Sequence, residues 1–386
     1  MSAPRLAFVY HRVAPEDLGG AERYYAALTR TLARDQPVTY LAGYQWDGPR
    51  TMRRDGVEYV ALGPPSRAAD TRRGRFVPKL RFAAALIWHL LRHGGRYDVV
   101  HACCFPHVAV LAVRAGLLPH RRTRLVVDWH EVLPRETWRR RLGFVGEAGW
   151  LVQSLAVRCG DAAVTFSRLH ARRLRDEGVR APVHVLPEFL PEGSEPAWPP
   201  AGPRRRLVVF AGRLVAEKRP ELVPAVVAAL RRRDPDWSGV IFGSGPHQPA
   251  VAAAVEAHQV HDAVRLAGFT PWAEVEAAML EGAALVFPSA REGFGLVVLE
   301  AAASGLPAVL VDEPDNAATE LVDDGVNGTV VAGADPELMA EAVTALADRP
   351  EIHQATRAWY EDASRRFSLE GAAEAHRALH ETLLRR

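Results

Sequence analysis

One stretch, residues 287–306 (FPSAREGFGLVVLEAAASGL), constrains the fold most strongly because it joins a strand, a glycine-rich loop and a helix. The apolar run 283–287 predicts a buried strand and 288–295 a loop. The run 296–304 predicts a helix that Gly305 closes at its C-terminus. An α/β architecture with parallel sheets accounts for such units when strands and helices alternate along the chain, as they do here.

Two carboxylates bracket this loop with seven residues between them, Glu292 before the helix and Glu300 within it. The free backbone N–H groups near Gly295, Leu296 and Val297 form an anion site. Glu300 lies about five residues into the helix, or ~7.5 Å along its axis, roughly the distance from a diphosphate to a nucleoside ribose. The layout predicts binding of a nucleotide-diphosphate sugar, with Glu292 facing the sugar. A surface loop with one carboxylate at the helix dipole is the alternative.

The spacing resembles the E-x7-E signature of the family-4 retaining glycosyltransferases of the GT-B fold, the group 1 glycosyltransferases. In that family the first Glu contacts the donor sugar and the second the ribose. Residues 207–222 resemble the family's first C-domain segment, and 242–246 and 264–271 follow in the family's order. Thr270 and Pro271 fit as N-cap and first residue of the next helix. The resemblance is strong over 207–331 and looser before residue 191.

The resemblance implies a set of site residues. The expected catalytic residues are His130, Glu292, Arg213 and Lys218, and the expected donor-binding residues are Gly19, Gly20, Gly212, Gly243, Phe269, Gly293, Phe294, Gly295, Leu296 and Glu300.

Composition adds an independent argument for Lys218. Of 48 basic residues only Lys79 and Lys218 are lysines. A lysine in the expected diphosphate loop therefore indicates a specific role. An ammonium is a compact charge that fits a crowded phosphate site where a planar guanidinium does not. A lysine that happens to lie on a solvated helix start is the alternative.

The N-terminal half carries fainter signals. The strand 6–10 leads through a loop to Gly19 and Gly20, where the backbone can approach a ligand, and the family uses this loop beside the donor phosphates and the acceptor. A plain β–α turn is the alternative. A dehydrogenase is excluded because the segment at Gly19 and Gly20 lacks the third glycine of the G-x-G-x-x-G motif. His130 lies at the end of an apolar strand and resembles the family's active-site histidine. His101 is the competing histidine, and we interpret it as structural.

The organisation predicts an α/β protein of the GT-B fold, with two Rossmann-like parallel-sheet domains facing a central cleft. The 386 residues are enough for two domains with their own cores. We expect an acceptor-binding domain over 1–190, a Pro-rich linker over 191–205 and a nucleotide-sugar-binding domain over 206–365. Residues 366–386 are expected to form a helix that crosses back to the N-terminal domain.

No metal and no cofactor is expected, since the nucleotide sugar is a co-substrate. Asp234 and Asp236 form a D-x-D that follows a helix, whereas a metal-binding D-x-D should follow a strand. His130 and Glu131 begin an HExxH-like pattern that Pro134 breaks, and the three cysteines lack metal-ligand spacing.

Charge is divided unequally along the chain. Residues 1–200 contain 30 Lys+Arg against 19 Asp+Glu, and residues 201–386 contain 18 against 27. The basic, aromatic-bearing stretches 72–96 and 138–150 are candidates for contact with an anionic membrane. Two crossover helices with solvated Arg faces are the alternative. We expect no signal peptide, no membrane span, no nucleic-acid partner, and a cytoplasmic location, at most peripheral on the inner membrane face.

The resemblance implies metal-independent, retaining transfer from a UDP- or GDP-sugar to a hydroxyl acceptor in a glycan, glycolipid or secondary metabolite. Front-face attack is implied, with a donor phosphate oxygen as base. Residues 315–321 (DNAATEL) lack the family's glycine pair, which puts donor identity in doubt. A nucleotide-sugar epimerase and a non-catalytic nucleotide-sugar-binding subunit are the alternative functions.

Overall fold

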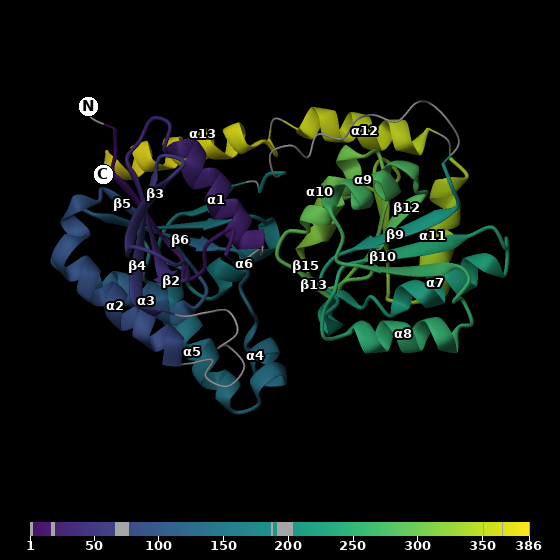
Figure 1. Cartoon of the computed structure of the whole chain (residues 1–386), viewed down its shortest axis with the longest axis horizontal. Helices are drawn as coiled ribbons and strands as arrows, with labels where there is room; N and C mark the ends of the chain where they lie inside the picture. Colours follow the sequence, from purple (N-terminus) through teal and green to yellow (C-terminus); the bar gives the residue numbers. More distant parts are fainter. Residues whose placement is uncertain are drawn as a thin grey trace. The chain divides into compact units, whose positions relative to one another are not determined.

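The computed structural model describes residues 3–16, 20–65, 77–186, 188–190, 204–349, 351–364 and 366–385. The chain forms two compact units, shown in Figure 1. The first unit comprises Met1–Pro191 with Arg366–Arg386, and the second comprises Glu192–Arg365. The predicted linker, 191–205, lies almost wholly outside the described residues.

The first unit contains an eight-stranded sheet in the order β3-β4-β2-β1-β5-β6-β7-β8. Its strands are β1 (Leu6–Val9), β2 (Val38–Tyr44), β3 (Thr51–Arg54), β4 (Val57–Pro65), β5 (Val99–Cys103), β6 (Arg124–Trp129), β7 (Ala162–Thr165) and β8 (Val183–Val185). All neighbours pair in parallel except β3, which runs antiparallel to β4 at the edge. The strand order reverses between β1 and β5, which makes this the switch point of the sheet.

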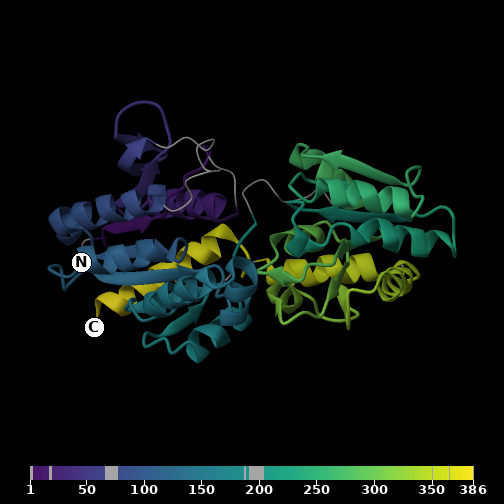
Figure 2. The same cartoon turned by 90° about the horizontal axis from the view of Figure 1, so that it is seen from below.

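Helices cover both faces of this sheet, as the two views in Figures 1 and 2 show. They are α1 (Gly20–Leu32), α2 (Val77–His93), η2 (Gly94–Arg96), α3 (His107–Gly116), α4 (Arg135–Leu142), α5 (Val145–Val157), α6 (Arg168–Asp176) and α13 (Leu369–Leu384). Side chains alternate along a strand. In β1, Ala7 and Val9 join the core under α2 and α3, whereas Phe8 faces Tyr25 of α1. The last helix, α13, packs beside α1 on that second face.

Each of the two candidate membrane-contact stretches, 72–96 and 138–150, has an aromatic residue in the interior. Phe82 of α2 belongs to the core, and Trp138 of α4 is buried with its indole N–H donating to Gln153 at 3.1 Å. The helical period turns these side chains inward, so the amphipathic pattern packed the helices against their own unit. Trp88 of α2 is 61% exposed.

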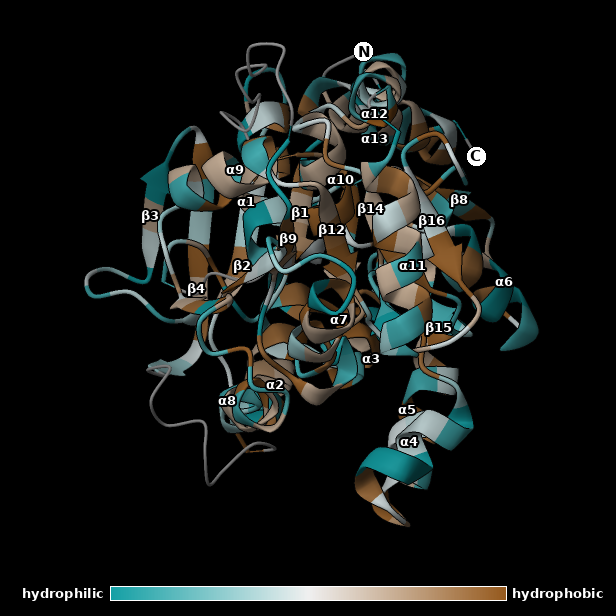
Figure 3. Ribbon diagram, turned by 90° about the vertical axis from the view of Figure 1, so that its right-hand side faces the viewer, coloured by the Kyte–Doolittle hydropathy of each residue, from teal (hydrophilic) through white to brown (hydrophobic). Residues whose placement is uncertain are grey.

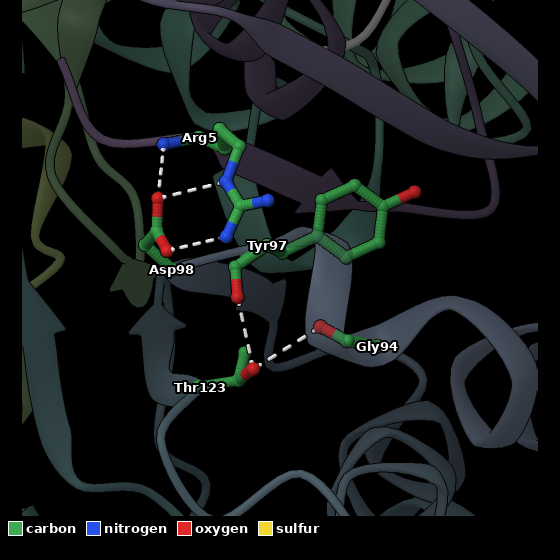
Figure 4. Close-up of polar contacts among 5 residues, drawn as sticks. All are labelled: Arg5, Gly94, Tyr97, Asp98 and Thr123. Atoms are coloured by element: carbon green, nitrogen blue, oxygen red, sulfur yellow. Dashed lines mark hydrogen bonds and ion pairs between the residues drawn. The ribbon is translucent and has the colours of Figure 1, made fainter. Parts of the chain in front are cut away.

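The amino ends of the central strands are fixed by polar contacts, drawn in Figure 4. Asp98 accepts hydrogen bonds from the Arg5 backbone N–H at 2.7 Å and from its guanidinium at 3.1 and 2.8 Å. The Thr123 hydroxyl lies 3.1 Å from the Gly94 carbonyl oxygen and 2.9 Å from that of Tyr97. These contacts hold the starts of β1, β5 and β6 in register.

The second unit contains a six-stranded, wholly parallel sheet in the order β11-β10-β9-β12-β14-β16. Its strands are β9 (Leu207–Ala211), β10 (Ser238–Phe242), β11 (Val264–Gly268), β12 (Ala284–Phe287), β14 (Ala308–Val311) and β16 (Gly328–Val331), with a separate small sheet of β13 (Arg291–Glu292) and β15 (Asp315–Asn316). β9, β12 and β14 are buried along their whole length, as parallel strands covered on both faces must be, and Figure 3 colours β12 and β14 as hydrophobic.

The strand order of this sheet reverses between β9 and β12. The helices of the unit are η3 (Ala216–Lys218), α7 (Leu222–Arg231), α8 (Gln248–Ala257), α9 (Trp272–Glu281), α10 (Leu296–Ala303), η4 (Ala317–Leu321), α11 (Pro336–Ala347) and α12 (Ile352–Ala363). The expected pair of parallel-sheet α/β domains is therefore confirmed. Among the described helices, none combines the length and the apolar character that crossing a membrane requires.

The Arg5–Asp98 contact yields a stability prediction. Hydrogen bonds from Arg5 hold the pKa of Asp98 below its ordinary value, so the contact stabilises at neutral pH and is lost as pH falls through the lowered pKa. Because both side chains are partly exposed, Asp98→Asn should cost only about 1 kcal/mol. Calorimetry at neutral pH should detect a lower Tm than wild type, and the difference should shrink only as pH falls below ~4 toward the lowered pKa of Asp98.

Asp262→Asn serves as the control for this variant. Asp262 is bonded to Arg231 at 2.8 Å and its side chain is 56% exposed. Its replacement should change Tm less than Asp98→Asn does. Equal effects would show that the three-contact arrangement at Asp98 adds nothing.

Candidate active site

The loops that follow β9 and β12 form the candidate site of the second unit. These strands are parallel neighbours at the point where the strand order reverses, so their carboxyl ends open onto one crevice. The loop after β9 carries Arg213 and Lys218, and the loop after β12 carries Glu292. The topology therefore brings together segments about 75 residues apart in sequence, in agreement with the 74-residue separation of Lys218 and Glu292.

Lys218 and Glu292 form an ion pair within this crevice. The Lys218 ammonium nitrogen lies 2.5 Å from Glu292 Oε1, and the two side chains are only 22% and 12% exposed. The same nitrogen lies 4.6 Å from the ring centroid of Phe287, a cation–π contact at the end of β12. Partial burial strengthens this pair relative to a surface pair. Glu292 thus holds the ammonium in place and offsets its charge.

Arg213 differs from Lys218 in its surroundings. It lies one residue beyond Gly212 at the end of β9, is exposed, and forms no ion pair with a described residue. Its guanidinium is therefore the cation of this loop that an incoming anion meets without displacing a carboxylate. Arg219, six residues further, is bound to Glu313 at 2.6 Å.

Backbone contacts join the loops after β9, β10 and β11. The Gly243 N–H donates to the Gly268 carbonyl at 2.7 Å, and the Leu214 N–H donates to the Ser244 carbonyl at 3.0 Å. Gly243 has φ +119, and a Cβ there would lie 1.9 Å from the Gly212 carbonyl oxygen. Only glycine at position 243 permits this close packing of the two loops, and the donor-binding roles of Gly212 and Gly243 stay predictions.

The helix α10 starts from Gly295, which adopts φ +100 and supplies no side-chain cap. A Cβ at Gly295 would lie 2.4 Å from Ala318 Cβ, so glycine is required at this turn. The N–H groups at the start of α10 are not capped by a side chain from Gly295, as an anion site requires. Glu300 is half-buried on the fifth residue of this helix.

The other expected donor-binding residues occupy varied surroundings. Gly293 and Leu296 are half-buried, Phe294 is buried, and Phe269 is 83% exposed after β11. Their roles stay predictions. The helix α9 begins at Trp272 with Pro271 as N-cap, so the expectation of Thr270 as N-cap was wrong. An extended backbone continues through Pro271, which shifts the helix start by one residue.

Asn316 is a structural residue that sequence reasoning missed. Its side-chain amide donates to the carbonyls of Ser289 and Val311 at 3.2 and 3.1 Å, and its oxygen accepts from the Ala318 N–H at 3.2 Å. β15 also pairs with β13 in register Glu292↔Asn316. Residues 315–321, which lack the family's glycine pair, therefore support the loop that carries Glu292. An Asn preceding a small-residue helix start was the available signal.

The D-x-D segment lies away from these loops. It precedes β10, at the amino end of the strand, whereas the candidate site lies beyond the carboxyl ends. Asp234 binds Arg206 at 2.7 Å and accepts a hydrogen bond from the Asp236 N–H at 3.0 Å. These carboxylates form a turn between α7 and β10.

The first unit places His130 just beyond the end of β6. Its Nδ1 lies 3.5 Å from Glu188 Oε1, and its ring stacks on Phe166 with centroids 4.6 Å apart. Its Nε2 is buried without a hydrogen-bond partner in the described structure. Burial alone lowers the pKa of His130, but the hydrogen bond and charge of Glu188 outweigh burial and raise the pKa above its ordinary value. Glu188 is a second residue that sequence reasoning missed.

The remaining candidate residues of the first unit are the glycine pair before α1 and the histidine His101. Gly20 is the exposed first residue of α1, with no atom near the position of a Cβ, and Gly19 lies outside the described residues. His101 is completely buried, and its Nδ1 lies 3.1 Å from the Asp128 carboxylate. Its environment agrees with the interpretation of His101 as structural.

Two family models match the chain. The model for group 1 glycosyl transferases covers residues 198–365, and that for the glycosyl transferase 4-like domain covers residues 19–188. Together they cover most of both units. The chain is a group 1 glycosyltransferase of the GT-B fold.

Curated relatives match this glycosyltransferase over part of their length. An alpha-D-kanosaminyltransferase of Streptomyces kanamyceticus is 34% identical over 150 residues, which is 39% of this chain and 38% of that protein. A D-inositol 3-phosphate glycosyltransferase of Frankia alni is 35% identical over 153 residues, 37% of each chain. The match thus spans less than two fifths of these relatives' length.

Solved structures share the fold of this glycosyltransferase along nearly the whole chain. Sucrose-phosphate synthase from Thermosynechococcus elongatus aligns with a TM-score of 0.77 at 17% identity, over 98% of this chain and 99% of that one. HepE from Anabaena, solved with UDP and glucose, aligns with a TM-score of 0.72 at 17% identity, over 98% and 100% of the two chains. At this identity the likeness establishes the fold.

The His130–Glu188 pair in this glycosyltransferase yields a pH prediction. Glu188→Gln removes the charge that raises the pKa of His130, so the His130 ring protons should titrate at lower pH by NMR than in wild type. A raised pKa stabilises below the unfolded-state pKa and is lost as pH rises through the folded-state value. The variant should therefore lose more stability near pH ~5.5 than near pH ~8.

Glu147→Gln is the matched control, because Glu147 binds Arg135 and Arg139 on α4 rather than a histidine. It should leave the His130 titration unchanged. An unchanged His130 pKa in Glu188→Gln would remove Glu188 as its electrostatic partner.

Proposed function

We propose that this chain is a retaining glycosyltransferase that transfers a sugar from a UDP- or GDP-sugar to a hydroxyl acceptor. The observation that carries the proposal is the Lys218–Glu292 pair, 2.5 Å apart between the loops of a switch point. A cation for the diphosphate and a carboxylate for sugar hydroxyls are thereby side by side. The uncapped start of α10 and the exposed Arg213 supply further attraction for a phosphate.

The proposed mechanism rests on electrostatic stabilisation of the leaving diphosphate. Negative charge builds on the bridging oxygen as the sugar–oxygen bond breaks. Arg213, Lys218 and the α10 N-terminus stabilise that charge from fixed positions, so little reorganisation is needed during the reaction. With two cations and a helix terminus assigned to this work, the proposal requires no metal ion.

The carboxylates have separate roles in this proposal. Glu292 is held by Lys218 and accepts hydrogen bonds from the donor sugar. Glu300, on the fifth residue of α10, accepts hydrogen bonds from the ribose. The acceptor hydroxyl attacks the anomeric carbon on the face from which the diphosphate departs, and a donor phosphate oxygen takes its proton.

His130 binds the transferred sugar in this proposal. Its Nδ1 is directed to Glu188 and its Nε2 has no hydrogen-bond partner in the described structure, which leaves Nε2 for a sugar hydroxyl. Glu188 acts as a positioning residue that orients the ring. Gly19, Gly20, Gly212, Gly243, Phe269, Gly293, Phe294, Gly295 and Leu296 complete the proposed donor site.

Relatives support the choice of donor class. HepE was solved with UDP, with UDP and glucose, and with UDP-glucose. The name of the kanosaminyltransferase gives a transferred sugar, and the name of the D-inositol 3-phosphate glycosyltransferase gives an acceptor. We therefore propose a UDP-sugar as the first donor to test. The acceptor class remains a hydroxyl of a glycan, glycolipid or secondary metabolite.

The alternatives differ in what they need from an acceptor. An epimerase of the same fold converts the nucleotide sugar without needing an acceptor, and a non-catalytic subunit binds donor without turnover. The family matches do not favour either alternative. The presence of Lys218, Glu292 and His130 in ordered positions supports a catalytic protein.

A transfer assay tests the proposed function. Donor binding is measured by calorimetry with UDP-, GDP-, ADP- and TDP-sugars, and nucleotide release is then followed with and without acceptor mixtures. Release should depend on acceptor, persist in excess EDTA, and give a product with the donor's anomeric configuration by NMR. A nucleotide sugar that changes its configuration without an acceptor would indicate an epimerase, and an inverted product would overturn the retaining mechanism.

The two glutamates should have different kinetic signatures. Glu292→Gln should chiefly lower kcat because the sugar is no longer oriented, and should tighten nucleoside diphosphate binding because Lys218 loses its carboxylate. Glu300→Gln should raise the donor KM with a smaller effect on kcat. Lys218→Ala and Arg213→Ala each remove a contact of about 1.5–3 kcal/mol, or tenfold to a hundredfold or more in turnover.

Glu313→Gln provides the comparison for these variants, because Glu313 binds Arg219 rather than Lys218. It should leave nucleotide affinity nearly unchanged. Identical kinetic signatures for Glu292→Gln and Glu300→Gln would refute the orientation assigned to residues 287–306.

We also propose that the hairpin of α4 and α5 docks on an anionic membrane. Its turn exposes Leu142, Phe144 and Val145 at 46%, 92% and 60%, next to the exposed arginines 139–141. Figure 3 shows the brown end of this hairpin standing clear of the other elements. An apolar tip beside a cationic run matches the acyl–headgroup boundary of an anionic lipid surface. This supports a peripheral location on the inner membrane face.

Vesicle co-sedimentation tests this docking. The protein should bind phosphatidylglycerol vesicles at low salt and detach near ~0.5 M salt, where the Debye length is only a few Å. Phe144→Ser should weaken binding to the vesicles. Leu118→Ser should not, although Leu118 is also an exposed apolar residue, at 67%. Equal binding to neutral phosphatidylcholine vesicles would exclude the electrostatic part of the proposal.

A further inference from the structure

A group of buried polar side chains lies between the first sheet and the helices α1 and α13. His101 of β5 and Asp128 of β6 meet His376, one turn before His380 on α13, and all four are at most 1% exposed. The proposed sugar transfer uses none of them. Burying several ionisable groups is costly unless each is paired or binds a metal ion.

The hydrogen bonds of this cluster orient its side chains. His101 Nδ1 lies 3.1 Å from both carboxylate oxygens of Asp128, and Tyr25 donates its hydroxyl to Asp128 Oδ2 at 2.8 Å. His101 Nε2 lies 2.8 Å from His380 Nε2. His376 Nδ1 lies 2.8 Å from the Ala372 carbonyl, which makes Nδ1 the protonated nitrogen.

One consequence concerns the other nitrogen of His376. With its proton on Nδ1, Nε2 carries a lone pair, and this atom is fully buried without a hydrogen-bond partner in the described structure. A neutral imidazole with a free lone pair is the form that ligates a metal.

We propose that His101, Asp128 and His376 bind one divalent transition-metal ion, for which Zn²⁺ is the expected occupant. One donor atom from each of the three residues lies within 4.8 Å of the others. Zinc bonds of about 2.0–2.1 Å place tetrahedral ligands roughly 3.3 Å apart, so the longest separation closes by about 1.5 Å on binding. Two imidazoles and a carboxylate are a donor set that zinc accepts, with a water in the fourth position.

Each proposed ligand has a partner that orients it. Tyr25 donates to Asp128, and the Ala372 carbonyl accepts from His376. With Nδ1 of His101 on the metal, its Nε2–H donates to His380. Such outer partners fix the tautomer and ring orientation of metal-binding histidines. In this cluster each of the three proposed ligands has such an outer partner.

A proton in place of the metal is the competing arrangement. A doubly protonated His101 would bridge Asp128 and His380 and satisfy both of its own N–H groups. It would leave the buried His376 Nε2 without a partner. A metal ion uses that lone pair, which is why the metal is favoured. The metal would also join α13 to β5 and β6 within the first unit.

Elemental analysis of the full-length chain, made without a histidine tag in zinc-supplemented medium, tests the proposal. We expect about one zinc per chain after desalting, a lower Tm after dialysis against dipicolinate, and recovery of Tm with Zn²⁺ but not Mg²⁺. His376→Gln and Asp128→Asn should lose the metal. His353→Gln should keep it, because His353 is a buried histidine of the second unit bonded to the Gly305 carbonyl at 2.9 Å.

Tyr25→Phe probes the outer partner without removing a ligand. It should retain the fold and weaken zinc affinity about 10- to 100-fold in a chelator competition. If the ligand variants do not fold, wild-type protein loaded with Co²⁺ decides, since a tetrahedral site gives strong visible absorption. Absence of both bound zinc and the cobalt spectrum in wild type, or full metal content in His376→Gln, would overturn the proposal. Metal content is measured on the same sample before and after the EDTA transfer assay, which separates this buried site from metal required for transfer.

Discussion

Parallel pairing of buried strands is the constraint on which both units depend. Strands such as β12 and β14 have no polar face, so helices must cover both sides of the sheet. Parallel neighbours also need crossover connections, which bring every strand-to-helix loop to one edge. Where the strand order reverses, two such loops diverge and leave a crevice. The chemistry of the second unit follows from which loops lie there.

The electrostatics of that crevice is more balanced than a simple cationic pocket. Glu292 offsets the charge of Lys218, while Arg213 is exposed two residues beyond β9. A paired ammonium costs less to hold in a partly buried position than an unpaired one. When an anion arrives, the ammonium can turn part of its hydrogen bonding to it because it has three donors. The site therefore combines a cation that is paired with a carboxylate, Lys218, and an exposed cation, Arg213.

The sequence predicted the architecture well because the relevant signals are local and repeated. Apolar runs such as 283–287 and the Gly295 helix start could be recognised from residue type alone, and β12 and α10 lie where those signals placed them. The family and the fold followed from the same segments. Donor and acceptor could not be predicted, because they depend on side chains that converge only in three dimensions.

Contacts between distant segments were also beyond sequence reasoning. Glu188 meets His130 across 58 positions of the chain, and nothing in the PEFLP segment marks it as a histidine partner. Asn316 was visible only as a departure from a pattern, although its three hydrogen bonds support the Glu292 loop. Thr270 was misassigned because the preference of threonine for N-caps is weaker than the local backbone path set by Pro271.

Because α13 belongs to the first unit, the order of synthesis on the ribosome affects how that unit folds. The first unit's strands are all synthesised before residue 191, yet the helix α13, which contacts His101 and Tyr24, is synthesised after the second unit. That face of the nascent sheet waits through the whole synthesis of the second unit for its cover. At about 5–20 residues per second this interval is on the order of ten seconds or more. The buried aromatic and ionisable groups on that face are thus enclosed only after the second unit has been synthesised, which ties maturation of the first unit to completion of the second.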